Sequence, residues 1–117
     1  FNRVVIDEDY GGLALADEGK RCAEMLSDSP CHVMIMCNHG ILVTGETVAQ
    51  TFNRLYYFER AAETYIKALW TGQTLRRMSD EMAESLAAAL ETYYSPTYSH
   101  FTELVAILDR EEPDYRD

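Results

Sequence analysis

The sequence has few basic residues for its size. Ten lysine and arginine residues stand against 20 aspartate and glutamate residues, so the 117-residue chain has a formal net charge of −10 and a sequence pI near 4.6. Proteins that bind the phosphate backbone of nucleic acids need clustered lysine and arginine side chains. The composition therefore predicts a protein that does not bind nucleic acid.

Long apolar runs are also missing. The runs Val33–Met36 and Ile41–Val43, like every other in the sequence, fall far short of the roughly 20 residues that a membrane-spanning helix needs. No charged-then-apolar leader opens the chain, so we expect a soluble, cytoplasmic protein that does not bind membranes. The chain begins at Phe1 rather than at Met, and a strand-like segment, Arg3–Ile6, follows almost at once. This start predicts a piece of a longer chain.

Cysteine is scarce and irregularly spaced. Cys22, Cys31 and Cys37 match neither a C-x-x-C metal knuckle nor a disulfide framework. We predict reduced, mostly buried thiols. The chain also lacks the glycine-rich nucleotide-binding motifs, the G-x-S-x-G nucleophile motif and any Cys/His cluster with zinc spacing. These absences remove the commonest sequence signatures of catalysis.

What the chain does have is material for a core, because 47% of its residues are hydrophobic. That share predicts one small domain. Residues 3–6, 32–37 and 41–44 are short apolar runs rich in β-formers, so we predict buried strands there, with a polar connection over residues 7–12. Residues 38–40 end in glycine and suit a hairpin turn between the last two strands.

Helical spacing of apolar residues follows in the rest of the chain. A first helix should begin at Asp17, its predicted N-cap, and end where residues 27–30 lead into a proline. Thr47 and Gln50 fit a capping box, so a long helix should begin there and end near Trp70. Two more helices are predicted over residues 79–93 and 97–109, before a charged tail. Strands first and helices last indicate a sheet with helices packed on it.

His39 is the strongest candidate for chemistry. It lies in the predicted turn Asn38-His39-Gly40. A neutral imidazole is the commonest metal ligand, and a glycine-flanked turn lets other groups approach it closely. The alternative is a solvated or turn-stabilising histidine, and one histidine alone does not decide between them. Cys37, two residues earlier, is half of a metal site at most and is also typical of a core thiol. His32 and His100 have no partner pattern and are expected to be ordinary surface or hydrogen-bonded core residues.

Glu59 is anomalous because it falls on an otherwise apolar helical stripe with Phe52, Leu55, Ala62 and Ile66. A buried carboxylate is costly unless it is paired or hydrogen-bonded. We therefore expect Glu59 to be buried with a partner, either in a structural ion pair or near the turn at residues 38–40, where it would orient His39. Glu63 should face away from this stripe.

Several segments together resemble the class II aldolase/adducin family. They are Asn38-His39-Gly40-Ile41-Leu42-Val43-Thr44-Gly45, Thr47–Phe52 and Leu55–Ala62, joined by Asp9–Leu15 and Phe101–Tyr115, which are similar to the adducin-type branch. The likeness spans nearly all of the chain. It implies a three-layer α/β/α sandwich with a mostly antiparallel sheet, assembled as a homotetramer.

The resemblance also implies a site for zinc or another divalent metal at a subunit interface. In aldolase members of the family, an H-x-H pair and the histidine of the NHG turn bind the metal, and His39 matches the third of these ligands. The H-x-H pair, the carboxylate base and the phosphate-binding loop lie upstream in the family, and nothing in this sequence matches them. Residues 1–117 are therefore expected to form the C-terminal part, about half, of a single such domain.

Two functions are compatible with that resemblance. The intact protein is expected to be a metal-dependent lyase that cleaves a carbon–carbon bond in a small sugar phosphate or a related hydroxycarbonyl compound. The alternative is an adducin-like, non-enzymatic domain that serves assembly or protein interaction. Catalysis depends on whether the missing part carries the other metal ligands, because a catalytic zinc site needs three protein ligands and one open position.

Overall fold

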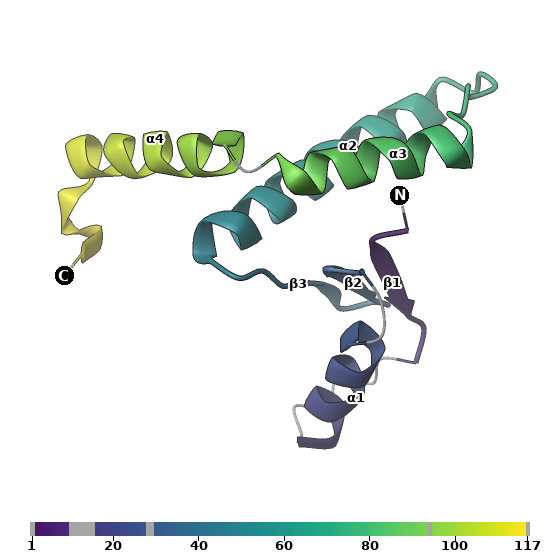
Figure 1. The fold of residues 1–117 in the computed structure, drawn as a ribbon, viewed down its shortest axis with the longest axis horizontal. Helices are drawn as coiled ribbons and strands as arrows, with labels where there is room; N and C mark the ends of the chain where they lie inside the picture. The colour runs from purple at the N-terminus through teal and green to yellow at the C-terminus, as the bar shows by residue number, and fades with distance from the viewer. Residues whose placement is uncertain (1, 10–15, 28–29, 94, 117) are drawn as a thin grey trace. The chain divides into compact units, whose positions relative to one another are not determined.

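The structure, a computed structural model, describes residues 2–9, 16–27, 30–93 and 95–116. The chain divides into two compact units, residues 1–45 and residues 46–117. The first unit holds the strands and one helix, and the second holds the remaining helices (Figure 1). Residues 10–12 of the predicted polar connection lie outside the described residues.

The first unit is built on a three-stranded sheet in the order β1-β2-β3, formed by β1 (Val4–Asp7), β2 (Val33–Met36) and β3 (Gly40–Val43). β1 and β2 are parallel, with Val4 opposite Val33 and Asp7 opposite Met36. β2 and β3 are antiparallel, with Val33 opposite Val43. The three predicted strands are thus confirmed, but this part of the sheet has one parallel and one antiparallel pair rather than a mostly antiparallel pattern.

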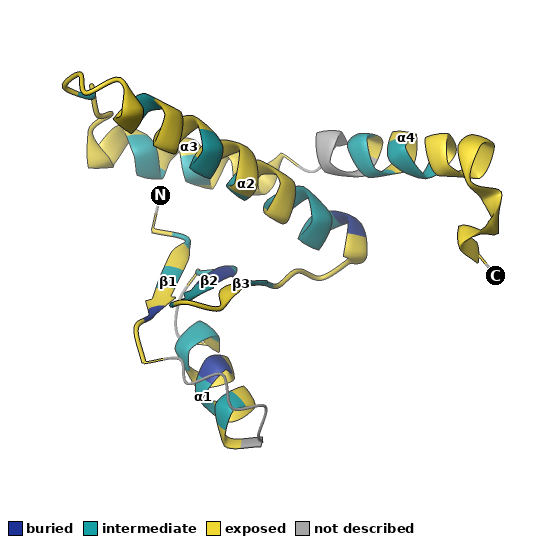
Figure 2. Ribbon diagram, turned by 180° about the vertical axis from the view of Figure 1, so that it is seen from behind, coloured by how far each residue is buried: buried dark blue, intermediate teal, exposed yellow. Residues whose placement is uncertain are grey.

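α1 (Ala16–Ser27) connects β1 to β2 as the helix of a β-α-β unit. It begins at Ala16, so Asp17 lies within its first turn and is not the N-cap that we predicted. The buried residues of this unit are Cys22 of α1, Val33 and Met34 of β2, and Asp7 at the end of β1. The core of the first unit therefore lies around the central strand and its connection to α1 (Figure 2).

α2 (Val48–Trp70) opens the second unit, and Thr47 is its N-cap, as the sequence predicts. The hydroxyl of Thr47 accepts from the backbone N–H of Gln50 at 3.1 Å, and the Gln50 side chain accepts from the backbone N–H of Glu46 at 2.7 Å. The return bond thus reaches the residue before the cap rather than the cap itself. Both bonds satisfy amides near a helix end that has no intrahelical acceptors for them.

Two further helices complete the second unit: α3 (Asp80–Thr92), capped by Ser79, and α4 (Ser95–Glu111), followed by the 3-10 turn η1 (Pro113–Arg116). α4 begins two residues earlier than predicted, since proline is tolerated in the first turn of a helix, where its missing N–H has no intrahelical partner. It also continues into the segment predicted to be a charged tail. None of the described helices is long and apolar enough to cross a membrane.

Aromatic rings join α2 to α4. Phe52 lies with its ring centroid 5.6 Å from that of Phe101, and Tyr56 lies 4.7 Å from His100 in an edge-to-face arrangement. Such pairs stabilise a contact beyond the apolar area that they bury. Elsewhere the helices of this unit keep much of their apolar surface exposed (Figure 2).

Candidate functional site

The candidate site is the turn at residues 37–39, which joins β2 to β3. Asn38 has a positive φ of 60°, and Gly40, the first residue of β3, has a φ of 153°. Asparagine and glycine tolerate such angles better than other residues, which explains why this sequence makes so tight a connection. The backbone N–H of His39 donates to the carbonyl of Met36 at 3.0 Å and closes the turn.

His39 is exposed at this turn. The antiparallel pairing of β2 and β3 confirms the predicted hairpin, and His39 lies on its exposed turn. Cys37 lies in the turn itself, half-buried, and its backbone N–H donates to the carbonyl of Asp7 at 3.1 Å. The turn is thus anchored at its base to the end of β1.

Glu59 does not have the environment that its place in the apolar stripe predicted. It is exposed, because the stripe of α2 is itself only partly covered, with Leu55 38% and Ile66 47% exposed. The expected burial is therefore wrong. Glu63 carries the polar contacts instead, pairing with Lys67 at 2.5 Å and with Arg60 at 3.2 Å. These cations, Lys67 first, lower the pKa of Glu63.

A second polar cluster, which sequence analysis did not find, lies at the end of β1. Asp7 is 1% exposed and accepts two hydrogen bonds from Arg21 of α1, each 2.6 Å long. Arg21 also pairs with Glu18 one turn earlier. The sequence predicts a polar connection that begins at Asp7, whereas Asp7 is the last residue of β1, and Glu18 and Arg21 are half-buried.

The ligand atoms of Asp7, Glu18 and Cys22 lie within 4.8 Å of one another, close enough to hold a metal ion. Arg21 already binds both carboxylates of this group, however, and brings a positive charge to the position that a cation would take. Hydrogen bonding to Arg21 lowers the pKa of Asp7, although burial opposes this shift. The cluster is therefore an ion-pair network centred on Arg21, and its chemistry does not favour a metal.

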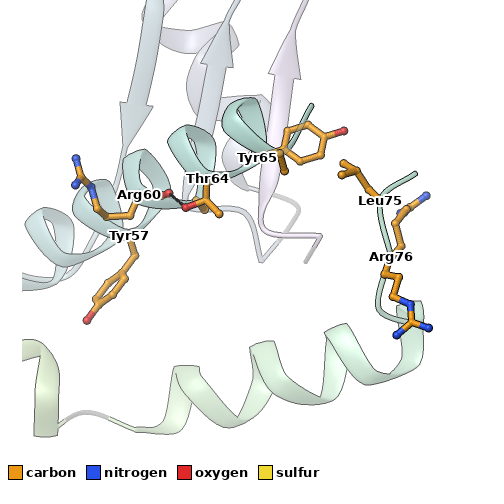
Figure 3. A pocket seen from close by; sticks show the side chains of 9 residues that line it. Tyr57, Arg60, Thr64, Tyr65, Leu75 and Arg76 are labelled. Carbon is orange, nitrogen blue, oxygen red and sulfur yellow. Dashed lines mark hydrogen bonds between the residues drawn. The ribbon is translucent and has the colours of Figure 1, made fainter. Parts of the chain in front are cut away.

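A shallow groove of about 600 Å³ runs along α2 in the second unit (Figure 3). Side chains of α2 and of the α2–α3 connection line it. Tyr57 lines this groove, whereas its neighbour Tyr56 belongs to the aromatic contact with α4. The lining residues are Tyr57, Arg60, Ala61, Thr64, Tyr65, Ala68, Leu75, Arg76 and Arg77.

The other two histidines differ from each other. The backbone of His32 extends the sheet, accepting from Thr44 at 2.9 Å and donating to Arg3 at 3.2 Å. His100 packs on the aromatic rings of α2, and its buried Nδ1 atom has no hydrogen-bond partner among the described residues. His39 thus remains the histidine that the described structure presents on a tight turn.

The first unit therefore has the form of an α/β domain fragment in which a β-α-β unit and a hairpin present one exposed histidine. The family profile of the Class II Aldolase and Adducin N-terminal domain matches residues 1–66, which is more than half of the chain. The protein belongs to the class II aldolase/adducin family.

Structural comparison agrees with that assignment. The chain is similar to an aldolase II superfamily protein from Pseudomonas syringae, with a TM-score of 0.77 and 29% sequence identity. The match covers 98% of this chain and 46% of the other, so the chain spans less than half of that protein's length. A search of curated proteins finds no match.

Proposed function

We propose that the intact protein is a metal-dependent lyase of the class II aldolase type, and that His39 is one of its metal ligands. The substrate class is a small sugar phosphate or a related hydroxycarbonyl compound, and the assembly is a homotetramer. In this proposal residues 1–117 are the C-terminal part of a single catalytic domain. The observation that carries the proposal is the exposed histidine on the β2–β3 turn of a class II aldolase/adducin chain.

The residues present fit one corner of a metal site. A neutral imidazole is a common ligand for zinc and similar divalent ions, and His39 is exposed on a turn that hydrogen bonds fix at its base. Within the described parts of the chain, the single set of three clustered ligand groups is Asp7, Glu18 and Cys22, which does not include His39. The remaining ligands would therefore come from other parts of the protein.

A bound divalent ion supplies Lewis acidity toward the oxygen atoms of a hydroxycarbonyl substrate. The contribution of His39 is a nitrogen lone pair, which is available only while that nitrogen carries no proton. Because the turn is short and closed by its own backbone hydrogen bond, the backbone of His39 has a restricted set of positions before any ligand binds. Such preorganisation lowers the entropic cost of binding.

Metal binding by the intact protein tests the proposal. We expect the wild-type protein, stripped with a chelator and reloaded with zinc, to bind about one ion per chain, and His39→Ala to bind it more than about tenfold more weakly. His32→Ala is the matched control, because His32 belongs to the same unit but lies away from the turn. Equal zinc affinity in the wild-type and His39→Ala proteins would contradict the proposal.

The non-enzymatic alternative has one observation in its favour. The helices of the second unit expose large apolar side chains, including Trp70 at 79% and Leu90 at 70%, a surface that suits assembly or protein interaction. An H-x-H motif with a nearby glutamate upstream of Phe1 would favour the enzyme. A parent sequence without these residues, combined with no zinc binding, would favour the adducin-like function.

A further inference from the structure

The base of the β2–β3 turn is hydrogen-bonded to Asp7 at the end of β1. The backbone carbonyl of Asp7 accepts from the N–H of Cys37, the first residue of the turn, at 3.1 Å. Asp7 also lies opposite Met36, whose carbonyl accepts from the N–H of His39 at 3.0 Å. One backbone hydrogen bond thus joins the end of β1 to the base of the turn, and a second, within the turn, holds the backbone of His39.

The side chain of Asp7 is held just as firmly. Its two oxygens accept one hydrogen bond each from the two terminal nitrogens of Arg21, at 2.6 Å. This two-point geometry fixes the orientation of a carboxylate as well as its position. Glu18 orients the guanidinium from the other side, and the backbone N–H of Asp9 donates to Asp7 at 3.2 Å.

Burial makes this arrangement dependent on Arg21. Asp7 is 1% exposed, whereas the Arg21 side chain is 35% exposed. A buried carboxylate that loses its partner is strongly unfavourable, and it moves toward water or takes up a proton. Since Asp7 is the last residue of β1, its movement would release the hydrogen bond to Cys37 and loosen the turn.

We propose that Arg21 and Asp7 are positioning residues for His39: their ion pair connects α1 to the end of β1 and thereby holds the β2–β3 turn in place. This inference rests on the proposed role of His39 as a metal ligand. In this proposal the ion pair does more than join α1 to the sheet, because the position of the turn that carries His39 depends on it. The fixed turn holds in place the backbone from which the His39 side chain extends.

The test uses the intact protein and two variants of the arginine. Arg21→Gln removes the charge and the two-point geometry, and Arg21→Lys keeps the charge alone. Val33→Ala is the control, since Val33 is buried in the same sheet but pairs with Val4 and Val43 at the end of β2 far from the turn. Amide hydrogen exchange and zinc affinity are measured at a temperature where all three variants remain folded.

We expect Arg21→Gln to accelerate exchange at the amides of Cys37 and His39 and to weaken zinc binding by about 10- to 100-fold, as when the partner of a metal ligand is removed. Arg21→Lys should recover part of both effects. Val33→Ala should lower the melting temperature through lost packing, with no comparable change at the turn or in zinc affinity.

The results test separately the positioning role of the Arg21–Asp7 pair and the proposed zinc site. Unchanged exchange at Cys37 and His39 in Arg21→Gln would overturn the positioning role, even if zinc affinity fell. An equal loss of zinc affinity in Val33→Ala would also overturn it, because the pair would then act through overall stability alone. If the wild-type protein binds no zinc, the proposed function fails, while the exchange data still decide whether the ion pair holds the turn.

Discussion

Asp7 illustrates how much a single residue contributes to this fold. It ends a strand, accepts a backbone hydrogen bond from the candidate site and carries a buried charge that Arg21 compensates. Hydrogen bonding to Arg21 is the main reason that the pKa of Asp7 lies below its ordinary value of 3.8, and the same bonds raise the pKa of Arg21. A lowered carboxylate pKa means that the folded state favours the charged form.

The pH dependence of stability follows from that shift. The stabilisation due to Asp7 is present above its ordinary pKa of 3.8 and is lost as the pH falls through its lower folded-state pKa, because the unfolded chain then binds the proton more readily. We expect the melting temperature to decrease as the pH is lowered below about 4. This decrease should be less steep in Asp7→Asn. Melting curves between neutral and acidic pH, with the exposed Asp17→Asn as control, measure this. Identical acid slopes in all three proteins would refute it.

The role of a single residue can be predicted from the sequence when it depends on neighbours in the sequence. The histidine of the turn was found because glycine and a neighbouring asparagine mark the turn directly. The partnership of Asp7 with Arg21 was not, because 14 positions separate them and only the β-α-β connection brings them together. Their signal in the sequence was faint: an acidic residue directly after an apolar strand, and Glu18 three residues before Arg21 on one helix.

At the scale of elements, local signals again account for what was predicted well. The Thr47 cap and the proline after α1 placed helix ends within a few residues, because capping and chain stiffness act over one turn. Burial was predicted less well. The apolar stripe of α2 suggested a covered face with Glu59 inside it, but coverage depends on distant partners, and in this structure Glu59 is exposed.

Gly19 and Gly40 of the first unit give element-scale predictions with opposite signs. Gly40→Ala places a Cβ at a φ of 153°, and the strained backbone should lower the free energy of unfolding by about 1–3 kcal/mol. Gly19→Ala lies within α1 with nothing within 4 Å of the new Cβ, and should raise it by about 0.5–1 kcal/mol. Urea unfolding of the intact protein measures both changes. Stabilisation of the protein by Gly40→Ala would contradict the strained turn.

For the whole molecule, the composition predicts a larger buried core than the structure shows. Nearly half of the residues are hydrophobic, yet the buried apolar ones among the described residues are Cys22, Val33, Met34 and Ala49. The chain spans 46% of the similar protein from Pseudomonas syringae. Apolar surface that a complete domain or an oligomer would cover thus remains exposed here, which no local pattern in the sequence reveals.

That surface predicts self-association of the 117-residue chain on its own. α3 exposes Met82, Leu86 and Leu90 by 54%, 45% and 70%, and patches of this kind promote association in water. We expect oligomers or aggregates in light scattering, reduced by the double variant Leu86→Glu, Leu90→Glu. A sharply melting, monodisperse wild-type monomer would contradict the interpretation of the chain as part of a larger domain.

The most direct measurement of the central claim is a crystal structure of the intact, zinc-loaded protein with anomalous diffraction recorded at the zinc edge. The account predicts a zinc peak with an imidazole nitrogen of His39 about 2.0–2.1 Å from it. The further ligands should come from residues outside this chain segment. Zinc bound elsewhere, with His39 directed away from it, would contradict the account.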